Sequence, residues 1–153
     1  MSQIESSSEL IPPSLPRAPF TAPSRNRETI LVVEDEAFVR EAMCKTLVFQ
    51  GYRVLKAGLA AEARIMFRRC RQTVSLLLTD VVLPDKNGSV LAQELREICP
   101  DLKAVLVSGY PNLGMRQSGA QEGVFYLPKP FSAESLLQTV RQALAQKIDE
   151  IAI

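Results

Sequence analysis

The sequence contains no histidine, and this absence removes several kinds of chemistry. A Ser-His-Asp hydrolase, a Cys-His protease and a metal centre with histidine ligands are excluded within this chain. The chain also cannot carry a phosphohistidine of its own. Its three cysteines, Cys44, Cys70 and Cys99, are an odd number without CxxC spacing, so neither a disulfide framework nor a zinc site is expected. Free thiols indicate a reducing compartment.

Long apolar runs and an excess of one charge are missing as well. No run approaches the roughly 20 apolar residues that span a bilayer, and the serine-rich and acidic start is not a signal peptide. The formal net charge of +1 provides no general attraction for nucleic acid or an anionic membrane. We therefore expect a cytoplasmic protein whose partners are neither nucleic acid nor membrane. Its 153 residues are one domain's length.

Residues 1–27 differ in composition from the rest of the chain. They show no hydrophobic periodicity and contain half of the ten prolines: Pro12, Pro13, Pro16, Pro19 and Pro23. Such a segment buries too little apolar surface to offset its ordering entropy, which predicts a disordered arm. The alternative is a docking arm that becomes ordered on a partner. The folded domain is expected over residues 28–148, with residues 149–153 as a short tail.

From residue 28 onward, short apolar runs alternate with helical patterns. Apolar runs predict strands at 30–33, 52–56, 74–79, 103–107 and 124–127. Helical spacing predicts helices at 36–50, 60–71, around 91–98 before Pro100, at 112–122, and from the capping residue Ser132 to about 148. In the first of these helices the apolar positions are Phe38, Ala42, Met43 and Leu47, and Gly51 ends it.

Five consecutive βα units with continuously apolar strands predict an α/β fold whose parallel sheet is covered on both faces. Right-handed crossovers leave few topologies, and five units suit the doubly wound flavodoxin-like order 2-1-3-4-5. In that order the strand sequence reverses between strands one and three. Ligands of such folds bind beyond the carboxyl ends of those two strands.

Acidic residues follow both of these strands. Glu34 and Asp35 come after the first strand and Asp80 after the third, so three carboxylates are expected near one point. Acids at strand ends can simply cap the following helices, but two such clusters converging at the switch point favour a divalent metal. Oxygen ligands without histidine or thiolate favour magnesium over zinc. Ser108 and Lys129 follow strands four and five and add a hydroxyl and a cation at the same edge.

These residues lie in four motifs whose order and spacing resemble response-regulator receiver domains over residues 28–148. The motifs are Ile30-Leu31-Val32-Val33-Glu34-Asp35-Glu36, Leu78-Thr79-Asp80-Val81-Val82-Leu83-Pro84 with Gly88, Val107-Ser108-Gly109-Tyr110 and Tyr126-Leu127-Pro128-Lys129-Pro130-Phe131. The resemblance implies a bacterial, single-domain switch of a two-component phosphorelay. Among receivers the chain looks most like those appended to hybrid sensor kinases.

The resemblance also implies a role for each site residue. Asp80 matches the phosphoacceptor. Asp80 is also expected to be a ligand of Mg²⁺ or Mn²⁺. Asp35 matches a direct ligand of this ion, Glu34 matches a ligand acting through water, and the backbone carbonyl of Val82 completes the protein's share. The phosphoryl-contacting and switch residues are Lys129, Ser108 and Tyr126, and the Lys129–Pro130 peptide bond is expected to be cis.

The implied partners are proteins. The phosphoryl group would come from a sensor histidine kinase or a histidine phosphotransfer protein, and an unknown downstream protein would read the switch. Too little chain follows Gln146 for a DNA-binding output domain. The protein is expected to be a monomer or a phosphorylation-dependent dimer through its fourth and fifth helices. Apolar Val82 and Tyr110 stand where many receivers have polar side chains, which predicts slow self-dephosphorylation.

Two other classes are open from the sequence. A pseudo-receiver would be a constitutive binding module without phosphotransfer, although all five chemical positions are intact. A phosphatase of the haloacid dehalogenase type would carry a second aspartate two residues after the first, where this chain has Val82. The favoured interpretation is not an enzyme, beyond assisting its own Mg²⁺-dependent phosphorylation and dephosphorylation at Asp80.

Overall fold

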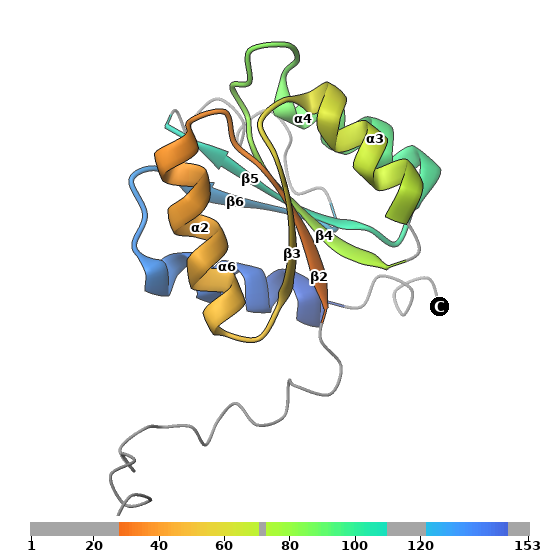
Figure 1. The fold of residues 1–153 in the computed structure, drawn as a ribbon. Helices are drawn as coiled ribbons and strands as arrows, with labels where there is room; N and C mark the ends of the chain where they lie inside the picture. Colours follow the sequence, from red (N-terminus) through yellow and green to blue (C-terminus); the bar gives the residue numbers. More distant parts are fainter. Residues whose placement is uncertain (1–27, 71–72, 110–121, 147–153) are drawn as a thin grey trace, which may run out of the picture.

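The computed structural model describes residues 28–70, 73–109 and 122–146. Within these residues one parallel sheet of five strands forms in the order β3-β2-β4-β5-β6 (Figure 1). The strands are β2 (Thr29–Val33), β3 (Arg53–Ala57), β4 (Val74–Asp80), β5 (Lys103–Ser108) and β6 (Val124–Pro128). Counted along the chain this is the order 2-1-3-4-5, which confirms the predicted fold class.

Helices cover both faces of this sheet. They are α2 (Ala37–Phe49), α3 (Ala60–Cys70), α4 (Gly88–Ile98) and α6 (Ala133–Ala145). In Figure 1, α3 and α4 lie on one side of the sheet and α2 and α6 on the other. No helix among the described residues is long and apolar enough to cross a membrane.

Successive strand residues serve two separate cores. In β2, Leu31 and Val33 pack with residues of α3 and α4, whereas Ile30 and Val32 pack with residues of α2 and α6. All four side chains are 0% exposed. A strand that is buried on both faces has no solvent-facing position, which explains why the apolar runs in the sequence do not alternate with polar residues.

The helix ends follow the local signals in the sequence. Gly51 has φ of 101°, a left-handed conformation that glycine adopts without steric cost, and it follows the last residues of α2. The Ser132 side chain accepts a hydrogen bond from the backbone N–H of Ser135 and caps α6 as predicted. At α4 the Asn87 side chain accepts from the N–H of Ser89.

The apolar face expected for α2 is partly wrong. Met43 and Leu47 are buried together with Cys44, but Phe38 is 81% exposed and Ala42 is also exposed. Phe38 and Ala42 line a pocket beside α2 and are not part of the core, whereas the adjacent Val39 packs against the core. Several predictions fall outside the described residues: the arm at 1–27, the end of the second predicted helix at 71, Tyr110, most of the helix at 112–122, the end of the last helix near 148, and the tail at 149–153.

Candidate functional site

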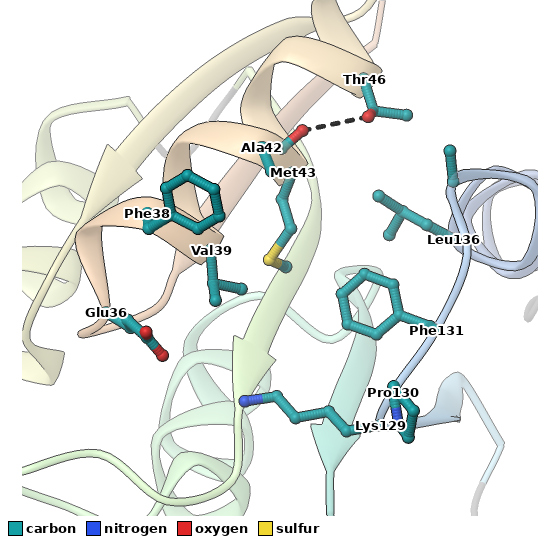
Figure 2. Close-up of a pocket in the computed structure, with 11 residues that line it drawn as sticks. Glu36, Phe38, Val39, Ala42, Met43, Thr46, Lys129, Pro130, Phe131 and Leu136 are labelled. Atoms are coloured by element: carbon teal, nitrogen blue, oxygen red, sulfur yellow. Dashed lines mark hydrogen bonds between the residues drawn. The ribbon is translucent and has the colours of Figure 1, made fainter.

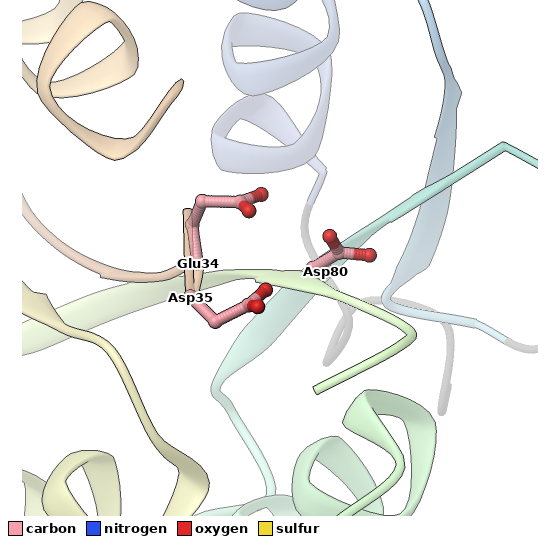
Figure 3. Close-up of side chains that lie close together, drawn as sticks. All are labelled: Glu34, Asp35 and Asp80. Atoms are coloured by element: carbon pink, nitrogen blue, oxygen red, sulfur yellow. The ribbon is translucent and has the colours of Figure 1, made fainter. Parts of the chain in front are cut away.

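Three carboxylates meet at the carboxyl edge of the sheet. Glu34 and Asp35 follow β2, Asp80 ends β4, and the two strands are direct neighbours. One oxygen from each carboxylate lies within 4.8 Å of the others, as Figure 3 illustrates. Glu34 is 1% exposed and Asp80 6%, whereas Asp35 is exposed. The predicted convergence of acids at the topological switch point is therefore present.

Lys129 brings a positive charge to this cluster from the loop after β6. Its Nζ donates a hydrogen bond to Asp80 Oδ2 at 2.9 Å and lies 3.6 Å from Glu34 Oε1. Asp80 Oδ1 accepts a hydrogen bond from the backbone N–H of Val82 at 3.1 Å. Both oxygens of Asp80 are thus oriented by neighbours that belong to two different loops.

Glu34 is a buried carboxyl group with a hydrogen bond to only one of its two oxygens within the described part of the chain. Its Oε2 accepts from the backbone N–H of Glu36 at 3.1 Å, but its buried Oε1 has no hydrogen-bond partner within the described part of the chain. Burial raises the pKa of Glu34 to about 7, and the nearby negative charge of Asp80 contributes. The N–H of Glu36 and the charge of Lys129 act in the opposite direction.

Lys129 is correspondingly stabilised in its charged form. Partial burial by itself would lower its pKa. The hydrogen bond to Asp80 and the negative charges of Glu34 and Asp80 outweigh that effect, so the pKa of Lys129 lies above its ordinary value. The ammonium group therefore stays protonated while it contacts both carboxylates.

The donor set fits a small divalent cation. Three carboxylates against one ammonium leave an excess of negative charge, and among the residues that the structure describes the buried Glu34 Oε1 has no hydrogen-bond partner. Hard oxygen donors suit Mg²⁺ or Mn²⁺. Asp35 is the exposed member of the three and is open to a hydrated ion. The carbonyl of Val82 remains a predicted ligand.

The loop between β4 and α4 is closed tightly against the end of β4. The N–H of Gly88 donates to the carbonyl of Val81 at 2.7 Å, and Val82 forms an isolated antiparallel bridge with Asn87. A Cβ atom on Gly88 would lie 2.0 Å from the backbone oxygen of Asp80. Only glycine permits this approach, which accounts physically for the Gly88 position of the second motif.

The remaining predicted residues lie around the same edge. Ser108 ends β5 and is 8% exposed, and its carbonyl accepts a hydrogen bond from the N–H of Lys129 at 2.9 Å. Tyr126 lies on β6, half-buried against the core on the α3 and α4 side. The Lys129–Pro130 peptide bond is cis. Tyr110 falls outside the described residues.

Two residues that support the site were not found from the sequence. Arg40 on α2 donates from Nη1 to the backbone oxygen of Glu34 at 2.8 Å, a contact across six residues that has no local sequence signal. Asp85 in the β4–α4 loop accepts from the N–H groups of Ala60 and Ala61, at the start of α3. The one sequence signal for this contact is Leu59, the residue before α3. Its side chain cannot accept a hydrogen bond, so the cap of α3 has to come from another segment.

A pocket of about 590 Å³ adjoins the carboxylates on the α2 side. Figure 2 shows Phe38, Val39 and Met43 of α2 facing Lys129, Pro130 and Phe131 across it. Its lining is mostly apolar, with Glu36, Thr46 and Lys129 as its polar members. Lys129 therefore borders both the acidic cluster and this pocket.

The fold and the site together define a doubly wound α/β domain with acids, a hydroxyl and a lysine at the carboxyl edge of its parallel sheet. Comparison with known proteins identifies the family. The sequence model of the response regulator receiver domain family matches residues 30–141 of this chain. The chain is 36% identical over 120 residues to the sensor kinase CckA of Brucella abortus, which covers 78% of this chain and 13% of that protein. It is 35% identical to the response regulator MprA of Mycobacterium leprae, over 80% of this chain and 54% of that one.

Solved structures agree with the fold. The receiver domain of a hybrid histidine kinase CckA superposes with a TM-score of 0.66 at 34% identity, covering 76% of this chain and 98% of that chain. The chain belongs to the response regulator receiver domain family. It spans 13% of the length of the matched sensor kinase and about half of the matched response regulator. Because the relatives include both a kinase and regulators, they do not single out the hybrid-kinase type.

Proposed function

We propose that this receiver domain is a phosphorylation-dependent switch that accepts a phosphoryl group on Asp80 from a histidine kinase or a histidine phosphotransfer protein. It then signals by protein–protein contact, in the cytoplasm, without being an enzyme acting on a separate substrate. The observation that carries the proposal is the Asp80 carboxylate, which is buried, fixed by Lys129 and the N–H of Val82, and flanked by Glu34 and Asp35.

The chemical step is a displacement at phosphorus. An oxygen of Asp80 forms the new P–O bond as the P–N bond of the donor's phosphohistidine breaks, and the imidazole keeps that electron pair. Mg²⁺ held by Glu34, Asp35, Asp80 and the carbonyl of Val82 would neutralise part of the negative charge that builds up as the phosphoryl oxygens approach the Asp80 carboxylate. Lys129 pairs with a phosphoryl oxygen in place of the Asp80 oxygen that it contacts in the unmodified protein.

The switch follows from the new charge at Asp80. The phosphoryl group carries nearly two negative charges and three acceptor oxygens. Because Asp80 gives up its own carboxylate charge when the bond to phosphorus forms, the net gain is about one negative charge. Hydrogen bonds to charged groups contribute roughly 1.5–3 kcal/mol each, so two new bonds, from the Ser108 hydroxyl and a backbone amide, would total about 3–6 kcal/mol. Lys129 exchanges its bond to Asp80 for one to the phosphoryl group and adds no new bond. Shifting a two-state equilibrium from 1:99 to 99:1 requires about 5.5 kcal/mol of differential interaction. Movement of Ser108, followed by rotation of Tyr126 towards it, is the proposed response.

The donor protein must approach over the carboxyl edge of the sheet to reach Asp80. On the α2 side that edge presents the apolar pocket and the 81% exposed Phe38, with Lys129 as the boundary. We expect a protein that delivers a phosphohistidine to cover this surface, because docking there places the donor against the acceptor. A surface that is used only during transfer would also explain why a large aromatic side chain is left exposed.

Intact mass after incubation with acetyl phosphate tests the proposal. The wild type should gain one phosphoryl group, about 80 Da, only when Mg²⁺ or Mn²⁺ is present. Asp80→Asn should gain none. As a matched control, Asp101→Asn changes an exposed aspartate outside the acceptor cluster and should still gain the group.

Two results would go against the proposal. A gain that persists in Asp80→Asn would place the acceptor elsewhere. No gain in the wild type, from acetyl phosphate or from phosphorylated histidine kinases, would favour a pseudo-receiver that binds partners constitutively.

A further inference from the structure

Asp85 connects the loop between β4 and α4, which follows Asp80, to the start of α3. It lies between β4 and α4, five residues after Asp80. Its Oδ1 accepts from the N–H of Ala60 at 2.9 Å and its Oδ2 from the N–H of Ala61 at 3.0 Å. These are the first two backbone donors of α3, which have no partner inside the helix.

The helix α3 lacks the cap that its own sequence would normally provide. The residue before it is Leu59, which has no hydrogen-bonding side chain, and Gly58 precedes that. Glu62 reaches back to the N–H of Gly58 at 2.8 Å, one residue before the cap position, much as the acidic residue of a capping box reaches back to the cap. The missing half, the acceptor for the first helical N–H groups, comes from Asp85 on another loop.

The same loop carries the residues that shape the acceptor site. Residues 81–88 leave β4 and return to it, closed at the base by the hydrogen bond from Gly88 to Val81 and by the bridge between Val82 and Asn87. Asp85 lies between these pairs, where no strand supports the chain. The two hydrogen bonds to α3 are thus an outer anchor for a loop whose inner end donates the Val82 N–H to Asp80.

We propose that Asp85 is a positioning residue for the acceptor site: by capping α3 it fixes the loop that presents Val82 to Asp80 and to the divalent cation. The proposal rests on the function proposed above and assigns Asp85 no contact with phosphoryl group or metal. The lowered pKa of Asp85, which the N–H of Ala60 chiefly causes, agrees with a carboxylate that stays charged in this contact.

The test measures Mg²⁺ affinity by titration calorimetry for the full chain and three variants. Asp85→Ala removes both hydrogen bonds and should weaken Mg²⁺ binding about tenfold, the low end for a residue that supports a metal ligand indirectly. Asp85→Asn retains one acceptor oxygen and should lie between Asp85→Ala and wild type. Ile65→Gly is the control, because it destabilises the middle of α3 at a half-exposed position without touching the loop.

Hydrogen exchange gives a second readout that needs no metal. In metal-free Asp85→Ala the amides of residues 81–88 should exchange faster than in wild type, whereas Ile65→Gly should leave them unchanged. Equal Mg²⁺ affinity in wild type and Asp85→Ala would overturn the positioning role and leave the proposed function standing. Equal weakening by Ile65→Gly would reduce Asp85 to a contribution to stability and overturn the role too. Failure of the wild type to bind Mg²⁺ would overturn both proposals.

Discussion

A Cβ atom added to Gly88 would lie 2.0 Å from the backbone oxygen of Asp80, a distance that no folded chain accommodates without moving the backbone. We therefore expect Gly88→Ala to lower the free energy of unfolding by about 3 kcal/mol or more, the upper range for overpacking. Gly109→Ala is the matched control, because a Cβ there meets no atom of the described residues within 4 Å. Urea unfolding of both variants measures the difference, and equal stability would contradict the close approach.

Loss of Lys129 should leave two buried carboxylates without their cation. In EDTA, Lys129→Met is expected to lower the free energy of unfolding by about 1–3 kcal/mol, the cost of leaving a buried polar group unpaired. Mg²⁺ should restore more stability to this variant than to wild type. Lys86→Met, which breaks the partly exposed pair with Glu94, should cost no more than about 1 kcal/mol. Similar losses for both lysines would show that the Lys129 contacts do not stabilise the metal-free site.

The Asp85 contact predicts a pH dependence with a definite sign. The pKa of Asp85 lies below its ordinary value of 3.8 because the N–H of Ala60, and then that of Ala61, stabilise the carboxylate. Its contribution to stability is therefore complete above pH 4 or so and lost as the pH falls through the folded-state value. Melting temperatures of wild type and Asp85→Asn should differ at pH 6 and converge under strongly acidic conditions. A constant difference at every pH would be incompatible with this cause.

Phe38 should matter for transfer from a protein and not for transfer from a small molecule. With any phosphohistidine protein that phosphorylates the wild type, Phe38→Ala is expected to slow transfer about tenfold, the effect of losing an aromatic anchor. Its rate with acetyl phosphate should not change. Phe49→Ala, at the far end of α2 and 87% exposed, controls for loss of an exposed aromatic. A slower reaction of Phe38→Ala with acetyl phosphate would indicate damage to the site instead of a docking role.

Val82 is 63% exposed beside Asp80, and an apolar side chain there cannot orient a water molecule towards the phosphoryl group. Val82→Asn should shorten the lifetime of the phosphorylated protein several-fold, followed by intact mass after removal of acetyl phosphate. Val82→Leu should leave the lifetime unchanged, since it adds no polar atom. A wild-type lifetime no longer than that of Val82→Asn would count against the proposed slow self-dephosphorylation.

Most strands and helix ends could be predicted from the sequence, because each depends on residues within the same short segment. The strand runs of β2 and β4 are apolar since both of their faces are buried, and Gly51 and Ser132 mark helix ends by their own backbone and side-chain chemistry. The acids of the candidate site could be placed together because parallel strands bring their carboxyl ends to one edge.

What the sequence did not provide depends on contacts between distant segments. Asp85 and Ala60 are 25 residues apart, and neither residue type indicates the other. The exposure of Phe38 depends on which side of α2 packs against the sheet, and the apolar positions of the sequence do not determine this. The steric role of Gly88 likewise appears only when the oxygen of Asp80 is placed opposite it.

Lys129 has one side towards the carboxylates and the other towards the apolar pocket, and this position has a thermodynamic consequence. If Lys129 changes position when Asp80 is modified, the wall of the pocket changes with it. Any molecule that distinguishes the two positions must then bind with different affinity before and after modification. Reciprocity requires that the same molecule shift the phosphorylation equilibrium of Asp80 by the same factor.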